Sequence, residues 1–191
     1  MKKLFFGLIL NLMLLSSCAT YSPFPIGTQY GAFVRYGDGH HAGLDYSIRE
    51  GTPIIASSDG EVTSIEIPCP REWYCGGIFV DLHHSDNFNS RYGHLKKIYV
   101  KSGQVLKRGQ LIGLSGGGNN GYDHLHFVIF KDFSWPVYVN SFDPKEFWLG
   151  GKPQCFFPNK DYSSYSPKEI TLPIACGGYA KELISKIKSK D

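Results

Sequence analysis

The sequence predicts a mainly β protein built from antiparallel strands, with a short helix at the C-terminus. Three observations support this prediction. The chain contains 22 glycines and 11 prolines among 191 residues, and 15% of its residues are aromatic, a composition that suits short strands and tight turns. Short apolar runs are bounded by turn residues, and no helical periodicity longer than about three turns occurs before the C-terminus.

The expected strands all lie between turn-forming residues, and they run 43–47, 53–56, 60–67, 78–83, 91–95, 111–114 and 124–130. Segments 51–62 and 103–113 resemble each other weakly, since each places a glycine turn before a short apolar strand. This echo suggests two similar hairpin units in one sheet system. Residues 180–188 gather apolar side chains on one side and lysines on the other, which predicts an amphipathic helix.

The N-terminus is typical of an export signal. Lys2 and Lys3 precede an apolar run over 4–15, which as a helix would cover only about 18 Å of a hydrocarbon core about 30 Å thick. The run ends at Leu-Ser-Ser-Cys, which resembles a bacterial lipobox with Cys18 as the lipidated residue. An ordinary cleaved signal with an incidental cysteine is the weaker alternative. We therefore expect a lipoprotein signal peptide over 1–17 and membrane attachment through Cys18.

The remaining chain has room for one domain and a tail. We expect a linker over 18–35, the functional domain over 36–150 and a C-terminal extension over 151–191, read as an appendage because it is rich in Pro, Ser and Tyr. Cleavage at Cys18 would leave 18 basic residues against 17 acidic ones, with no long basic run. Nucleic acid is therefore an unexpected partner, and a monomer is expected.

Besides Cys18 the chain holds four cysteines, and an even number in an exported protein predicts disulfides. Three pairings are possible. We favour the two that are local in sequence, Cys69 with Cys75 and Cys155 with Cys176, because each closes a loop poor in regular structure. A cysteine metal site is the rival interpretation, but neither pair has the two-residue spacing of a zinc knuckle.

Two histidine motifs carry the candidate chemistry. His41 and Asp45 lie four residues apart in a glycine-containing turn, a spacing that suits either a metal site or a buried hydrogen bond. His124 and His126 lie two residues apart in an expected strand, so both side chains leave the same face while apolar residues leave the other. We therefore expect the latter two histidines to share one polar cleft.

Two imidazoles and one carboxylate form a donor set that zinc prefers, and a fourth position left open distinguishes a catalytic site from a structural one. Such a metal can lower the pKa of a bound water from about 15.7 to about 7 and polarise a carbonyl, which implies hydrolysis. Because the chain has no His-Glu-x-x-His helix to supply a glutamate base, His94 and His124 are the candidates for moving protons. Another divalent ion could occupy the same donor set.

At these motifs the chain resembles the LytM/lysostaphin-type zinc endopeptidases of peptidoglycan. The resemblance covers about residues 36–144, and its main elements are His41-Ala42-Gly43-Leu44-Asp45, Gly51-Thr52-Pro53, Tyr92-Gly93-His94-Leu95, Gly109-Gln110-Leu111-Ile112-Gly113, His124-Leu125-His126-Phe127 and Asp143-Pro144. It implies antiparallel sheets that form an open groove, of the duplicated hybrid, barrel-sandwich-like kind. It also implies one Zn²⁺ bound by His41, Asp45 and His126, with His94 and His124 assisting the attacking water.

The implied activity is hydrolysis of peptide bonds in peptidoglycan cross-links or stem peptides at the cell envelope, facing the periplasm from the outer membrane if the source is Gram-negative. Three departures from the family pattern leave substrate preference open: Val128 in place of a common Glu, an insertion over 66–77, and the tail after Gly150. His84 is interpreted as structural, and His40 and His83 as either solvated or supporting the metal ligands from outside.

Two other classes of function compete with the peptidase. A lipid-anchored relative without catalysis could regulate other wall hydrolases, although such members typically lack metal ligands, which this chain retains. A lipoyl or biotinyl carrier has a similar sheet architecture, but the chain has no Met-Lys-Met hairpin to carry the modified lysine.

Overall fold

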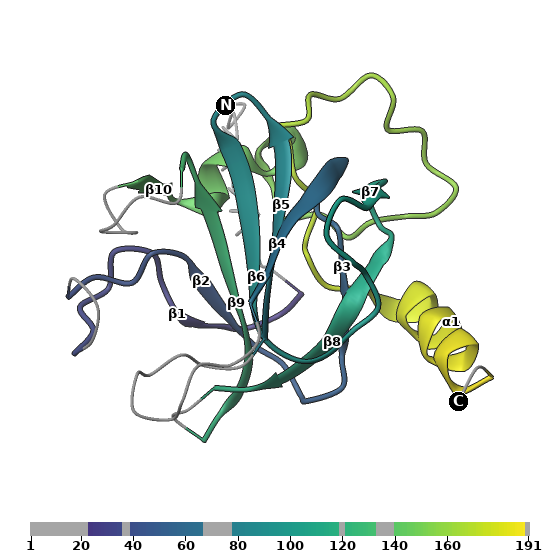
Figure 1. The fold of residues 1–191 in the computed structure, drawn as a ribbon, viewed down its shortest axis with the longest axis horizontal. Coiled ribbons are helices and arrows are strands. Elements are labelled where there is room, and N and C mark those ends of the chain that lie inside the picture. The colour runs from purple at the N-terminus through teal and green to yellow at the C-terminus, as the bar shows by residue number, and fades with distance from the viewer. Residues whose placement is uncertain (1–22, 36–38, 67–77, 119–120, 133–139, 190–191) are drawn as a thin grey trace, which may run out of the picture.

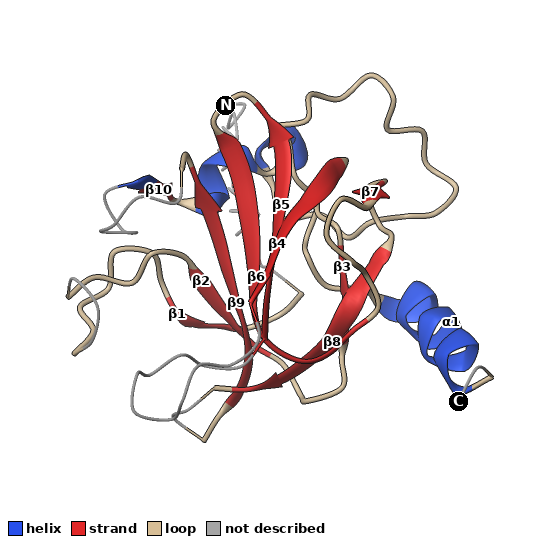
Figure 2. Cartoon of the chain, viewed as in Figure 1, coloured by secondary structure: helices blue, strands red, loops and turns tan. Residues whose placement is uncertain are grey.

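The structure is a computed structural model that describes residues 23–35, 39–66, 78–118, 121–132 and 140–189. Within these residues ten strands form one sheet in the order β1-β2-β9-β8-β6-β5-β4-β7, with β10 paired to β9 and β3 to β8. All of these pairings are antiparallel. The sheet curves without closing, and an α-helix lies beside it at the C-terminal end (Figures 1 and 2). The predicted fold class is confirmed.

The strands are β1 (Ile26–Thr28), β2 (Leu44–Ser47), β3 (Pro53–Ile55), β4 (Gly60–Glu66), β5 (Ile78–Ser85), β6 (Phe88–Ile98), β7 (Val105–Leu106), β8 (Leu111–Gly117), β9 (Asp123–Phe130) and β10 (Ser141–Phe142). Short 3₁₀ helices follow at Pro144–Phe147 and Leu149–Gly151, and α1 spans Gly177–Lys188. No helix in the described part of the chain is long and apolar enough to cross a membrane.

Each expected strand is present, but β6 begins earlier than its sequence pattern predicts. Asn89 and Ser90 look like turn residues, yet both are buried. The Asn89 amide donates to the backbone carbonyls of Phe130 and Lys131, at 3.3 and 2.9 Å. Polar residues can therefore continue this strand, because partners on neighbouring strands satisfy their hydrogen bonds: the end of β9 for Asn89 and His84 of β5 for Ser90.

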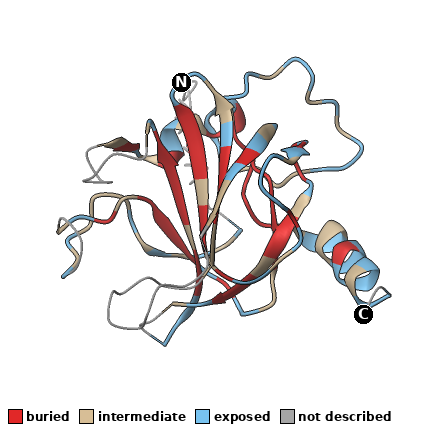
Figure 3. Cartoon of the chain, in the orientation of Figure 1, coloured by how far each residue is buried: buried red, intermediate tan, exposed pale blue. Residues whose placement is uncertain are grey.

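Alternation along β2 and β9 separates the core from the site. The apolar residues where the two strands pair are fully buried, namely Leu44, Tyr46, Leu125 and Phe127. Asp45 and His126 alternate with them and lie opposite each other in the pairing of β2 with β9. Gly43 allows the two strands to approach, since a Cβ there would lie 2.2 Å from the carbonyl oxygen of Phe127. Figure 3 shows buried residues concentrated along the strands. The hydrophobic packing thus fixes which face carries the polar side chains.

The C-terminal segment is part of the core, unlike the appendage that its composition predicts. Ile170, Leu172 and Ile174 are fully buried in the main hydrophobic cluster, and Ile174 forms a β-bridge with Ile54 of β3. Arg108 donates to the carbonyl of Glu169 at 2.7 Å. The alternation of these three apolar residues is a signal of a buried extended segment, but the surrounding prolines and serines obscure it.

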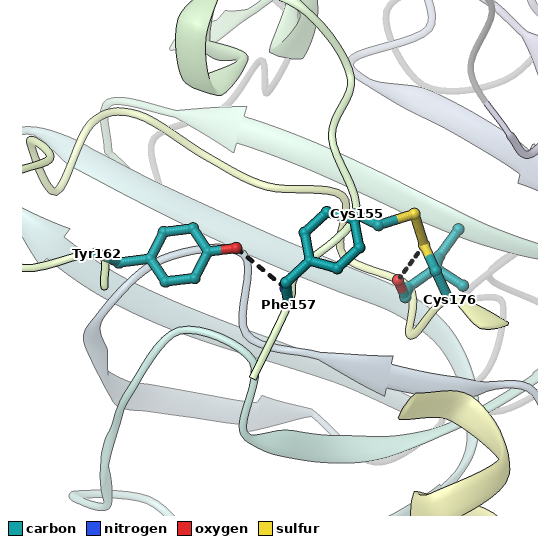
Figure 4. Close-up of a disulfide and its surroundings, with 5 residues drawn as sticks. Cys155, Phe157, Tyr162 and Cys176 are labelled. Carbon is teal, nitrogen blue, oxygen red and sulfur yellow. Dashed lines mark hydrogen bonds between the residues drawn. A yellow bond between two sulfur atoms is a disulfide. The ribbon is translucent and has the colours of Figure 1, made fainter. Parts of the chain in front are cut away.

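Cys155 and Cys176 form a disulfide, as the sequence-local pairing predicts (Figure 4). The bond joins the start of the C-terminal segment to the residue before α1, across a separation of 21 residues. Cys69 and Cys75 lie outside the described residues, as does Cys18. The pairing of Cys69 with Cys75 therefore stays a prediction.

Replacing Cys155 and Cys176 together with serine should lower the free energy of unfolding by about 3 kcal/mol, because a loop of this length gains conformational entropy in the unfolded chain. Urea unfolding of the oxidised wild type and the double variant measures the difference. Treating the double variant with a reductant is the control and should change nothing at this bond. Equal unfolding midpoints for the wild type and the variant would show that the bond does not stabilise the fold.

Candidate metal centre

Three side chains from neighbouring segments converge where β2 pairs with β9. Nε2 of His41 lies 3.0 Å from Oδ1 of Asp45, and Nδ1 of His126 lies 2.8 Å from the same oxygen. The two ring nitrogens are 3.0 Å apart. In the described part of the chain this is the one group of three or more His, Cys, Asp or Glu residues whose ligand atoms all lie within 4.8 Å of one another. Two imidazole nitrogens and a carboxylate oxygen aimed at one point fit a zinc ion.

A backbone carbonyl orients the first of these histidines. Nδ1 of His41 donates to the carbonyl oxygen of Gln29 at 3.1 Å, which leaves Nε2 to face Asp45 and His126. Histidine ligands commonly donate their second ring N–H in this way, which fixes the tautomer. Gln29 follows β1, and β1 pairs with β2, so the stretch predicted as a linker helps to position the site. The sequence gives no signal for this contact, because a backbone carbonyl is present at every residue.

The electrostatics of the group favour the protonation states that a metal requires. Burial alone would raise the pKa of Asp45, but hydrogen bonds and charge interactions with His126 and His41 outweigh it and hold that pKa well below its usual range. Burial lowers the pKa of His126, despite the opposing effect of Asp45. An ionised carboxylate and a neutral imidazole are the forms that coordinate a metal ion.

His94 and His124 lie directly beside this group. Their ring centroids are 4.3 Å apart, and the ring of His94 is 5.7 Å from that of His126. Nδ1 of His124 donates to the carbonyl oxygen of Tyr122 at 2.9 Å, and its Nε2 lies 3.9 Å from Oδ1 of Asp45. The structure therefore brings all five candidate residues together, from three strands and the turn before β2.

His94 has a left-handed backbone, with φ at 60°, inside β6. Among the described non-glycine residues only Asn87 shares this feature. The conformation costs on the order of 1 kcal/mol for a non-glycine residue and clusters at functional sites. The register between β6 and β8 shifts between Leu95 and Lys97, just after this residue. The strain was not predictable from sequence, since histidine is enriched at positive φ but this residue lies inside a strand, where that conformation is not expected.

The other histidines lie elsewhere. Nδ1 of His84 donates to the carbonyl of Asp59 at 2.6 Å, and its Nε2 lies 2.7 Å from Oγ of Ser90. Burial lowers the pKa of His84 to about 4, so the ring is neutral near pH 7. These contacts support its interpretation as structural. His83 and His40 are exposed.

Acid should destabilise the fold through His84. Its pKa is about 4 in the fold and about 6.5 in an unfolded chain, so the unfolded chain gains a proton first. The neutral ring stabilises the fold fully above pH 6.5, and this stabilisation is lost as the pH falls towards 4, by about 2 kcal/mol. Urea unfolding in EDTA at pH 7 and pH 4.5 measures the loss. His84→Gln should lose less than the wild type, and identical losses would contradict the assignment.

The fold is similar to that of solved structures. The catalytic domain of lysostaphin from Staphylococcus simulans superposes with a TM-score of 0.57 and 32% sequence identity, over 65% of this chain and 91% of that one. A structure described as LytU gives a TM-score of 0.54 and 32% identity, over 66% and 86% of the two chains.

Residues 39–139 match Peptidase family M23, which is more than half of the chain, and the chain belongs to this family. The match includes all five candidate residues. Membership makes an enzyme the favoured class of protein and leaves no support for the carrier hypothesis.

Curated relatives are named as endopeptidases. Peptidoglycan DD-endopeptidase ShyA from Vibrio cholerae is 41% identical over 90 residues, which are 47% of this chain and 20% of ShyA. Glycyl-glycine endopeptidase ALE-1 from Staphylococcus capitis is 36% identical over 111 residues, which are 56% of this chain and 27% of ALE-1. The match therefore spans only about a fifth to a quarter of these relatives.

Proposed function

We propose that this protein is a zinc-dependent endopeptidase that hydrolyses peptide bonds in peptidoglycan cross-links or stem peptides. The observation that carries the proposal is the convergence of His41, Asp45 and His126 on one point, with His94 and His124 beside them. A closed structural site would need a fourth ligand, and no other His, Cys, Asp or Glu among the described residues joins this group.

In this proposal His41, Asp45 and His126 hold one zinc ion, which when bound polarises the scissile carbonyl and lowers the pKa of a water molecule. His124 is oriented by its hydrogen bond to Tyr122, so Nε2 remains to take a proton from the attacking water and to return it to the leaving amine. His94, whose ring packs against His124, donates a hydrogen bond to the oxygen on which negative charge develops.

The proposed location of the protein in the cell is based on the export signal at its N-terminus. We propose that residues 1–17 direct export and that the lipid on Cys18 holds a monomer at a membrane surface within the cell envelope, which in a Gram-negative source is the outer membrane facing the periplasm. The relatives' peptidoglycan names support a substrate that is reachable from such a surface. Residues 1–22 lie outside the described part of the chain.

The test is release of soluble fragments from purified peptidoglycan. The zinc-loaded protein should release fragments that separate by liquid chromatography, EDTA should stop the release, and added zinc should restore it. A protein that binds zinc but leaves every wall preparation intact would contradict the proposal. If such a protein instead accelerated wall cleavage by an added amidase, the regulatory alternative would be correct.

A further inference from the structure

A cavity of about 510 Å³ lies between the C-terminal segment and the turns that connect β3 to β4 and β7 to β8. The two turns contribute Asp59, Lys107 and Arg108 to its lining, and the C-terminal segment contributes residues 156–163 in part. In Figure 1 this segment arches from the 3₁₀ helices past β7 before it returns to the sheet. None of the described lining residues belongs to the metal centre, whose residues come from β2, β6, β9 and the turn before β2. The cavity is therefore separate from the candidate metal centre.

The cavity carries an excess of positive charge. Lys107, Arg108 and Lys160 line it, and Asp59 is the one acidic residue among the described lining residues. Asp59 is compensated locally, since Lys107 lies 2.8 Å from Oδ2 and the backbone N–H of Arg108 donates to Oδ1 at 2.8 Å. Two positive charges remain in excess, which favours an anionic ligand.

The availability of these cations decides which anion fits. The Arg108 guanidinium is buried and donates to Ser57, Ser58 and the carbonyl of Glu169. This guanidinium supplies positive charge, but most of its N–H groups already donate within the protein. It therefore has few N–H groups available for the bidentate contacts that phosphate prefers. Lys160 instead presents its ammonium group as a point charge, and the ammonium group of Lys107, although paired with Asp59, belongs to a side chain that is 73% exposed. Because an ammonium group binds an anion as a point charge, two lysines beside a buried arginine favour a carboxylate over a phosphate as the ligand.

Aromatic packing holds this lining in place. The rings of Phe156 and Tyr162 stack with centroids 5.3 Å apart, and the Tyr162 hydroxyl accepts the backbone N–H of Phe157 at 3.0 Å (Figure 4). Phe156 lies on Gly109, where a Cβ would come within 2.3 Å of its ring. Nζ of Lys160 lies 5.2 Å from the Tyr162 ring centroid, within the range of a cation–π interaction. The ammonium group is thus positioned before any ligand binds.

We propose that this cavity binds a free carboxylate of the peptidoglycan polymer, as a second attachment point apart from the metal centre. The inference rests on the proposed function, which supplies the polymer. The stem peptides of this polymer carry carboxylates and methyl side chains, and the cavity is lined by lysines together with the aromatic residues Phe156 and Tyr162. Attachment at two points raises the effective concentration of substrate at the metal centre.

The test measures binding of the zinc-loaded full chain to insoluble peptidoglycan, in a His94→Asn background in which cleavage of the polymer is slow. Lys160→Gln should weaken binding about fivefold, because one charge-assisted contact is lost. Lys160→Arg should keep the affinity within twofold. Lys168→Gln is the matched control, since Lys168 is an exposed lysine of the same segment that is not among the cavity's lining residues. Peptidoglycan whose carboxyl groups have been converted to amides should bind wild type and Lys160→Gln equally.

Unchanged binding by a folded Lys160→Gln variant overturns the inference, and so does an equal loss on amidated peptidoglycan. A loss seen only on vesicles of phosphatidylglycerol would also overturn it, in favour of a lipid phosphate. If Lys160→Gln lowers the melting temperature, the same binding measurement is made with Lys107→Gln, and its result decides the test. Failure of the proposed function would give a different result from failure of this inference. The chain with His94 intact would then bind peptidoglycan with the same dependence on Lys160 but would cleave no bond in it.

Discussion

His126→Ala should remove the bound zinc and abolish hydrolysis of peptidoglycan. His126 supplies one of three donor atoms, and its loss leaves His41 and Asp45 as an incomplete ligand set. Because the metal provides both the activated water and carbonyl polarisation, we expect activity to fall by more than about 10³-fold. Zinc content is measured by elemental analysis of the purified protein, and activity by fragment release.

His83→Ala is the matched control for this experiment. His83 is an exposed histidine on β5, and its contact is a hydrogen bond of 2.9 Å between Nδ1 and the Asn89 side chain. Its loss should leave both zinc content and hydrolysis within twofold of the wild type. Full zinc occupancy in His126→Ala would mean that the ligand set is a different one.

His94→Asn should lower kcat by about 10² to 10³ while zinc stays bound. The ring of His94 lies beside His124 and His126, but His94 is not among the three converging ligand atoms. Loss of a group that moves a proton or stabilises charge typically costs about that much. Asparagine is the informative replacement, because it tolerates the left-handed backbone at φ 60° better than alanine does.

The result separates a catalytic role from a structural one. With zinc content and melting temperature unchanged, a loss confined to kcat supports the proton-transfer or charge-stabilising role. Loss of zinc together with activity would instead place His94 in the ligand set. Activity within twofold of the wild type would exclude it from catalysis.

Much of the site could be predicted because its motifs are local in sequence. The spacing of His124 and His126 fixes a shared face once the segment is a strand, and the apolar residues between them fix which face is buried. The structure places these side chains as that alternation predicts, next to Asp45 in the register of β2 with β9. The spacing of His124 and His126 is informative because strand geometry alone places side chains two residues apart on the same face.

Other features depend on contacts between distant segments. The carbonyl of Gln29 orients His41 across 12 residues of sequence, and the strain at His94 arises inside a strand whose register shifts beyond it. The return of Ile170 and Ile174 into the core depends on the path of the whole C-terminal segment. No short-range pattern encodes such contacts, since the tertiary fold determines which backbone groups meet.

The most direct test is digestion of a defined, cross-linked peptidoglycan fragment by the zinc-loaded wild type and by His126→Ala, followed by mass analysis of the products. The proposal predicts that the wild type gives two products whose masses sum to that of the fragment plus one water, identifying the bond that is cleaved, and that His126→Ala gives none. Identical products from both proteins, or an intact fragment after incubation with fully zinc-loaded wild type, would contradict it.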